Sequence, residues 1–288
     1  MKAWAILLIS CLLISQSFAT TIRTNQGLVN HAFQALNEKW GYVFSLFGEV
    51  LTMPRLIYLR DSHPTESVRR NIRDNFDFIV NNWMGRRVAD CSGLLKSYLW
   101  WVCNSSGKCD PKYESATDQN ETMMFNDAIE KGAISTIPDL PGVCVRLPGH
   151  IGYYVGNGTV IESRGTRYGV VLTQLKERPW THWFKHRHIK YNTFAEVVKK
   201  LTPLVKNVDY LYVNAAKGRS VSGDHVRSLI FNAGKRLESS CTSYERAVDV
   251  LYKHNVVISP DYWKQISDLS KVAGENVRSL AHSLFYVL

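Results

Sequence analysis

Residues 148–158 read PGHIGYYVGNG, a strand-like run that begins at His150 and ends in a glycine-rich turn. β-Branched and aromatic residues favour strands, and Gly and Asn favour the tight turns that join them. Three more short runs of this kind flank it, at residues 143–146, 160–163 and 169–173, and residues 180–191 are placed to close the same sheet. The pattern predicts an antiparallel meander.

Helical patterns precede this meander. Apolar residues recur at helical spacing in residues 28–39 and 66–84, and a third apolar run, 94–102, follows Asp90-Cys91-Ser92-Gly93. Residues 104–119 are polar and contain Gly, Pro and Cys109, which predicts a loop. Helices that precede an antiparallel sheet predict an α+β fold, with Cys91 at the start of a helix.

The last third of the chain has a different pattern. From Phe194 onwards apolar residues keep helical spacing, although Pro203 should divide that segment. Ser259-Pro260-Asp261 is typical of a helix start, and an apolar stripe follows it through residues 262–284. We therefore expect one domain over residues 20–193 and a helical accessory region over residues 194–288.

The N-terminus predicts secretion. An apolar run over residues 3–14 follows Lys2, and Ser17-Phe18-Ala19 supplies small residues for a signal peptidase, so residues 1–19 are expected to be a signal peptide. The mature protein is expected outside the cell or in the lumen of a secretory or phagocytic compartment. Removal of Lys2 leaves 34 basic against 25 acidic residues, a net charge of +9 that favours anionic surfaces or polymers. Sequons at Asn104, Asn120 and Asn157 predict exposed loops if the host glycosylates secreted proteins.

The cysteine count is odd. Removal of Cys11 leaves five cysteines, at positions 91, 103, 109, 144 and 241. Secreted chains usually pair their thiols, so one cysteine is either reactive or waits for another chain. The count alone does not choose between them.

Cys91 and His150 form a workable catalytic pair. A helix N-terminus carries positive potential and free N–H groups, which stabilise a thiolate over a thiol at Cys91. A histidine on a neighbouring strand can act as the base. The alternatives are that Cys91 is disulfide-bonded or simply buried, and that His150 only packs at a strand end.

Glu162 is the candidate that orients the imidazole. A three-residue turn, Gly156-Asn157-Gly158, would set Gly152 opposite Glu162 and leave Glu162 diagonal to His150 on one face of the sheet. A two-residue turn would send Glu162 to the opposite face. The proposed triad therefore depends on the length of the turn.

Taken together, these motifs resemble the NlpC-type cysteine peptidases. The resemblance covers roughly residues 28–191 and rests on the order, spacing and local sequence of four segments: Trp40-Gly41-Tyr42-Val43-Phe44, Asp90-Cys91-Ser92-Gly93, Gly149-His150-Ile151-Gly152 and Val160-Ile161-Glu162. It implies a papain-like fold and the cleavage of peptide bonds in bacterial cell-wall peptidoglycan. It also implies Cys91 as nucleophile, His150 as base and Tyr42 as a group near the oxyanion, with core packing as the alternative for Tyr42.

The chain departs from this family in three places. Many members carry a histidine where this chain has Glu162, although a carboxylate can orient an imidazole equally well. Phe44 is followed by Ser45-Leu46 and not by the usual pair of glycines. An insertion, residues 48–85, separates the tyrosine segment from the Cys91 motif and leaves the shape of the cleft and the substrate open.

If Cys91 is the free nucleophile, the other four cysteines can form two disulfides in three possible arrangements, and a bridge to Cys241 would tie the accessory region to the catalytic domain. His182, His186 and His188 lack converging acidic or cysteine partners at suitable spacing, so we expect no metal and no cofactor there, but a final strand with a solvated basic face. No nucleic-acid partner and no membrane span are expected. Two other functions remain: a catalytically silent protein that binds cell wall, and a cysteine-dependent acyl or peptidyl transferase.

Overall fold

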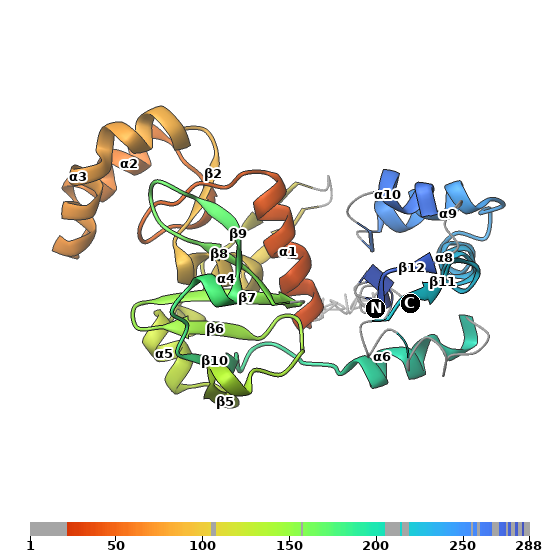
Figure 1. Cartoon of the computed structure of the whole chain (residues 1–288). Coiled ribbons are helices and arrows are strands. Elements are labelled where there is room, and N and C mark those ends of the chain that lie inside the picture. Colours follow the sequence, from red (N-terminus) through yellow and green to blue (C-terminus); the bar gives the residue numbers. More distant parts are fainter. Residues whose placement is uncertain are drawn as a thin grey trace, which may run out of the picture.

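The computed structural model describes residues 22–104, 108–156, 158–204, 214, 219–254, 256–257, 260–266, 271–274, 276–277, 280–281 and 284. The expected signal peptide and the sequon at Asn157 lie outside these residues. The fold is mixed α and β with an antiparallel sheet, as the sequence predicted. Figure 1 shows the sheet beneath α1, and the helices that follow residue 193 form a separate group.

The central sheet has six strands in the order β5-β10-β6-β7-β8-β9, and every adjacent pair is antiparallel. Its strands are β5 (Glu130–Ala133), β6 (Cys144–Leu147), β7 (His150–Gly156), β8 (Thr159–Ser163), β9 (Val170–Gln174) and β10 (His182–Lys185). Strands β6 to β9 are the predicted meander. Residues 180–191 contribute a strand to this sheet, as expected, but the expectation that this strand has a solvated face was wrong. Strand β10 lies between β5 and β6, and Phe184 is fully buried there.

Alternating side chains give the sheet two covered faces. On one face, Ile151, Tyr153 and Ile161 pack against helices α1 (Asn25–Asn37) and α4 (Cys91–Leu99). On the other face, Tyr154, Val160 and Trp180 belong to a separate apolar cluster. Because successive residues of a strand point to opposite faces, β7 contributes to both clusters.

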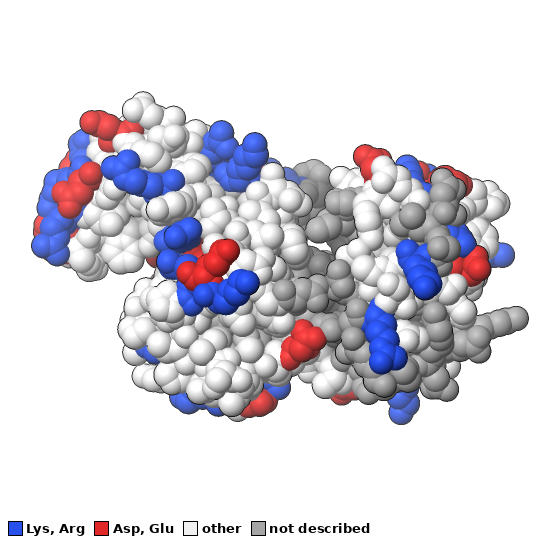
Figure 2. Space-filling view, in the orientation of Figure 1, with Lys and Arg blue, Asp and Glu red and all other residues white. Residues whose placement is uncertain are grey.

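The insertion forms a small helical unit. Strand β1 (Phe47–Val50) pairs with β2 (Arg87–Ala89), and between them lie α2 (Met53–Asp61) and α3 (Glu66–Trp83). Leu56, Leu59, Ile72 and Ile79 form part of its own buried cluster. The helix α3 was predicted, but α2 was not. Figure 2 shows basic and acidic side chains intermixed on the part of this unit that faces the viewer.

Residues 100–136 hold more structure than the sequence predicted. The expected helix over residues 94–102 ends at Leu99, and β3 (Trp101–Cys103) follows it. The expected loop contains β4 (Cys109–Pro111), which pairs with β3, and the 3-10 helix η1 (Ser115–Thr117). Along the chain, helix α5 (Glu121–Asn126) precedes β5 and the 3-10 helix η2 (Ile134–Thr136) follows it.

The C-terminal region has its own core. Its described elements are α6 (Phe194–Leu201), η4 (Thr202–Leu204), β11 (Val221–Ser222), α8 (Gly223–Leu237), α9 (Tyr244–Lys253), α10 (Pro260–Gln265) and β12 (Lys271–Val272). Helix α10 begins at Pro260, as predicted, but β12 interrupts the apolar stripe that was expected to continue the helix. Trp263, Ile266 and Leu280 are nevertheless buried in one cluster with α8 and α9.

One disulfide joins Cys103 to Cys109 across the β3-β4 hairpin. The expectation of a second disulfide was wrong, because Cys144 and Cys241 are free. Cys144 lies in the cluster beneath α1 and α4, whereas Cys241 lies in the C-terminal cluster, so each thiol is buried in a different core. No helix among the described residues combines the length and the apolar character that a bilayer span requires.

Candidate active site

Asp90 builds the start of α4. Its Oδ1 accepts hydrogen bonds from the Gly93 N–H at 2.6 Å and from the Ser92 hydroxyl at 3.0 Å, and its Oδ2 accepts one from the Ser45 N–H at 2.8 Å. A Cβ at Gly93 would lie 1.9 Å from the carbonyl oxygen of Leu46, so only glycine permits this approach. The Asp-Cys-Ser-Gly motif thus caps the helix and joins it to the loop that precedes β1.

Hydrogen bonds join Cys91 to strand β7. The N–H groups of Ile151 and Ser92 donate to its sulfur, and its carbonyl oxygen accepts a hydrogen bond from the Tyr153 hydroxyl at 2.7 Å. The side chain is buried, with 8% exposed. Burial, followed by the charge of Asp90, raises the pKa of the Cys91 thiol to about 12, and the two N–H donors lower it only in part. The thiol is therefore protonated at neutral pH, contrary to the thiolate that the helix N-terminus led us to expect.

His150 and Glu162 are joined directly. His150 Nε2 lies 2.7 Å from Glu162 Oε2, and both side chains are buried. The other carboxylate oxygen accepts a hydrogen bond from the Thr173 hydroxyl at 2.9 Å and lies 3.2 Å from Arg178 Nε. Burial raises the pKa of Glu162, but the hydrogen bonds from His150 and Thr173 outweigh it, so the net pKa lies below its ordinary value. Glu162 is accordingly a carboxylate held by three partners.

The β7-β8 turn explains how this pair forms. The turn is the two-residue kind, because Gly156 pairs with Thr159. A bulge between Tyr154 and Gly156 then shifts the register, so that Tyr154 pairs with Val160 and Tyr153 with Ile161. This is the register that a three-residue turn would have given. The bulge therefore returns Glu162 to the face of His150.

The Trp180 ring covers one face of the His150 imidazole. Its ring stacks on the His150 ring with centroids 5.7 Å apart and an angle of 12° between the planes. A Cβ at Gly152 would lie 3.1 Å from this indole and 3.3 Å from the Cβ of Glu162. The glycine between His150 and Tyr154 thus leaves the room in which Trp180 and Glu162 approach the histidine.

Tyr42 lies beside the nucleophile segment. Burial, followed by the charges of Asp90 and Cys91, raises the pKa of its hydroxyl well above the ordinary value. The hydroxyl is therefore a neutral donor, which is the form that could stabilise an oxyanion near Cys91.

The structure joins some of the predicted residues and not others. It brings His150 to Glu162, and it brings Cys91 and Tyr42 to the same helix start, next to the strand that carries His150. Among the contacts of the described side chains, no hydrogen bond links the Cys91 sulfur to the His150 ring. Since Nε2 faces Glu162, Nδ1 is the ring nitrogen left for the thiol.

Sequence reasoning missed four residues around this site. Thr173 and Arg178 hold Glu162, and Arg146 forms an ion pair of 2.5 Å with the buried carboxylate of Glu121, whose charge further raises the pKa of the Cys91 thiol. Thr173 pairs with Val160 in the register of β8 and β9, so alternation along the strands was the signal that could have placed it. Glu121 gave no such signal, because the structure of α5 was not predicted.

The histidines near residue 185 form no metal site among the described residues. His186 is buried and its Nδ1 accepts a hydrogen bond from the His188 N–H at 3.3 Å. Among the residues that the structure describes, no three His, Cys, Asp or Glu side chains converge as metal ligands would.

Comparisons with known proteins found no match: no protein-family model, no curated protein and no solved structure is similar to this chain. The resemblance to NlpC-type peptidases therefore rests on the motifs alone.

Proposed function

We propose that this protein is a secreted cysteine peptidase or amidase that hydrolyses peptide bonds of bacterial peptidoglycan. The proposal is carried by one observation. A buried histidine, oriented by a buried carboxylate at 2.7 Å, begins the strand on which the Cys91 sulfur rests. A nucleophile, a base and a group that orients the base are the parts that acyl transfer requires. In this proposal the chain has a papain-like arrangement, in which the helix that carries the nucleophile packs on an antiparallel sheet.

The neutral thiol decides the first step of the proposed mechanism. Because the Cys91 thiol is protonated at rest, His150 Nδ1 must take its proton as the sulfur attacks the substrate carbonyl. The imidazolium is stabilised by the Glu162 carboxylate, and backbone N–H groups near Cys91, with the Tyr42 hydroxyl, stabilise the oxyanion. His150 then protonates the leaving amine, and water releases the acyl group from the sulfur.

The substrate class is supported by the resemblance and by the expected compartment. The four motifs resemble those of a family that cuts cell-wall peptides, and a signal peptide would deliver the enzyme to a place where bacterial walls are accessible. The net positive charge favours approach to an anionic polymer.

The test compares mature wild-type protein with Cys91→Ala on purified peptidoglycan, and identifies released fragments by mass spectrometry. We expect fragments from wild type alone, with both proteins folded by circular dichroism. Cys144→Ala is the matched control, because it removes a buried thiol from β6 and should keep activity. Equal fragment release by Cys91→Ala would exclude Cys91 as the nucleophile.

A catalytically silent cell-wall binding protein is the second candidate. The buried thiol with a pKa of about 12, without a hydrogen bond to His150 among the described contacts, favours it. Co-sedimentation of both wild type and Cys91→Ala with insoluble peptidoglycan, without fragment release by either, would support this function and exclude the hydrolase.

A further inference from the structure

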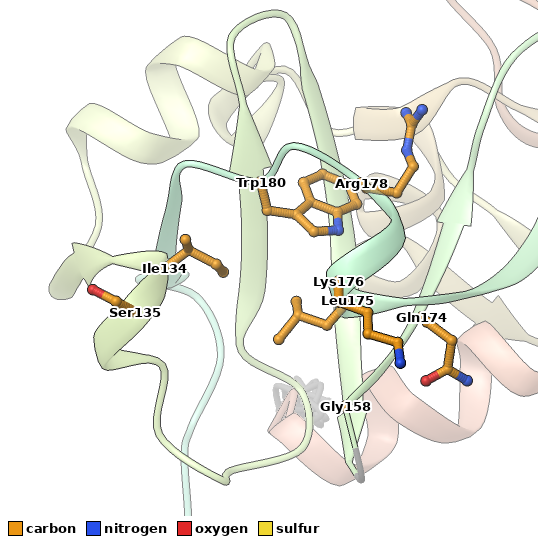
Figure 3. A pocket seen from close by; sticks show the side chains of 8 residues that line it. All are labelled: Ile134, Ser135, Gly158, Gln174, Leu175, Lys176, Arg178 and Trp180. Carbon is orange, nitrogen blue, oxygen red and sulfur yellow. The ribbon is translucent and has the colours of Figure 1, made fainter.

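Two pockets of the structure lie apart from the candidate nucleophile. One, of about 460 Å³, is lined in part by Trp180 (Figure 3), and the other, of about 340 Å³, is lined in part by Trp100. Neither includes Cys91, so a substrate bond that the sulfur attacks lies outside both. The loop before β1 is closer to the sulfur, because the Ser45 N–H donates to the side chain of Asp90, the residue that precedes Cys91.

Ser45 occupies a turn position that favours glycine. The Leu46 N–H donates to the Val43 carbonyl oxygen at 3.2 Å, and Ser45, the third residue of this turn, has a φ of 73°. This is the conformation of a type II turn, in which glycine avoids the strain of a Cβ. In the described part of the chain the only other non-glycine residue with a positive φ is Lys39, which follows the C-cap of α1, where that conformation is usual. No helix end accounts for Ser45, so its strain points to a role for the side chain.

His63, from the turn between α2 and α3, lies against this serine. Its Nε2 is 3.5 Å from Ser45 Oγ, and its Nδ1 accepts a hydrogen bond from the Thr65 N–H at 3.1 Å. Because Nδ1 is the acceptor, a neutral ring carries its proton on Nε2 and directs it to Ser45 Oγ. The Arg69 guanidinium donates to the His63 carbonyl oxygen and so holds the turn that carries this ring.

The Ser45 hydroxyl proton is then left for another acceptor. Its oxygen accepts from His63, and none of the contacts of the described residues gives the hydroxyl an acceptor of its own. Ser45 and Tyr42 are both partly exposed, so a substrate can approach them. The Asp90 carboxylate, which lies 2.8 Å from the Ser45 nitrogen, disfavours a second anion here. The acceptor that fits is therefore a neutral carbonyl oxygen.

We propose that the Ser45 hydroxyl binds a carbonyl oxygen of the peptide substrate next to the bond that Cys91 attacks, and that His63 orients the hydroxyl. The inference rests on the proposed function and adds to it. The insertion supplies His63, and a serine in place of the family's usual glycine supplies the donor. A hydrogen bond to a carbonyl that does not react is the same in the ground state and the transition state, so it lowers KM and leaves kcat unchanged.

The experiment measures binding of a soluble stem tetrapeptide to the Cys91→Ala protein by isothermal titration calorimetry, so that no turnover contributes. The probes are L-alanyl-γ-D-glutamyl-diaminopimelyl-D-alanine and its analogue with lysine as the third residue. Added Ser45→Ala or Ser45→Gly should weaken binding about tenfold, because each removes the hydroxyl. Added His63→Leu should weaken binding about threefold, because the hydroxyl remains but is no longer oriented.

Two glycine variants separate binding from folding. Ser45→Gly removes the strained Cβ, so its midpoint of thermal unfolding should be at least that of the parent protein even though binding is weaker. Lys39→Gly is the matched control, because it relieves the same backbone conformation at the end of α1. It should bind the tetrapeptide like the parent protein.

A kinetic readout completes the test. In the protein with Cys91 intact, Ser45→Ala should raise KM about tenfold and change kcat less than about threefold. The proposal is overturned if the Ser45 variants bind like the parent protein, if kcat falls and KM does not change, or if Lys39→Gly weakens binding equally. Binding of neither tetrapeptide by the parent protein would instead refute the proposed function, and this inference with it.

Discussion

The two sides of the candidate site differ in how firmly the fold holds the side chain that the proposed reaction needs. On the β7-β8 side, the Glu162 carboxylate is hydrogen-bonded to His150 and Thr173 and forms an ion pair with Arg178. On the α4 side, the sulfur of Cys91 has backbone N–H donors, and burial keeps its pKa at about 12. The candidate base is held in place by its neighbours, whereas the candidate nucleophile is a neutral thiol. In the proposed mechanism the thiol becomes a nucleophile only when its proton moves to His150.

Glu162→Gln tests the side of the site that holds His150 and should have the largest effect on activity. The amide keeps the shape but removes the charge that stabilises the imidazolium, so kcat should fall by about 10² to 10⁴. Steady-state hydrolysis of a peptidoglycan fragment measures this change. Glu130→Gln is the control, because it removes an acid from the exposed ion pair with Lys185 and should leave kcat unchanged. Equal activity of the two variants would remove Glu162 from the mechanism.

Alkylation of Cys91 tests the side of the site that holds the neutral thiol. A pKa of about 12 against an ordinary 9.0 means about a thousandfold less thiolate at pH 7 to 8 than in an unfolded peptide. The rate of reaction with iodoacetamide should rise tenfold per pH unit until pH approaches 12, as followed by mass spectrometry of the Cys91 peptide. A rate that levels off below pH 8, and that His150→Ala abolishes, would instead reveal a preformed thiolate–imidazolium pair.

Gly152→Ala tests the packing that holds the histidine. The added methyl group would lie 2.7 Å from Val160 Cγ1 and 3.1 Å from the indole of Trp180, so one of these side chains must move. We expect a loss of about 1–3 kcal/mol in the free energy of unfolding and a lower kcat, because Trp180 no longer stacks squarely on His150. Urea denaturation and hydrolysis measure the two effects. Wild-type values of both would show that the close approach is not required.

Thr173→Val tests the smallest contribution. Loss of one buried hydrogen bond should cost about 1 kcal/mol at neutral pH. The depressed pKa of Glu162 gives stability that is present above its ordinary value and lost as pH falls through the folded value. The variant raises the folded pKa toward the ordinary value, so it should lose less stability on acidification, and the difference in stability from wild type should shrink as the pH falls. Thermal unfolding between pH 3 and 7 checks this, and identical acid limbs would contradict it.

The sequence alone determined the parts of the site that depend on neighbours in the chain. Strand periodicity gave β6 to β9, helical spacing gave α1 and α3, and the Asp-Cys-Ser-Gly motif gave the helix start at Cys91. These patterns were readable because an amphipathic helix or strand repeats its apolar residues at a period that a single sequence displays.

Only the tertiary structure decided what depends on register and burial. The bulge between Tyr154 and Gly156, not the turn length, set Glu162 beside His150. Burial against β7 kept the Cys91 thiol neutral, whereas its place at a helix start had predicted a thiolate. Cys144 and Cys241 stayed unpaired because they lie in different cores. The burial of Cys91 and the separation of Cys144 from Cys241 are set by groups distant in sequence, whose approach no local pattern encodes.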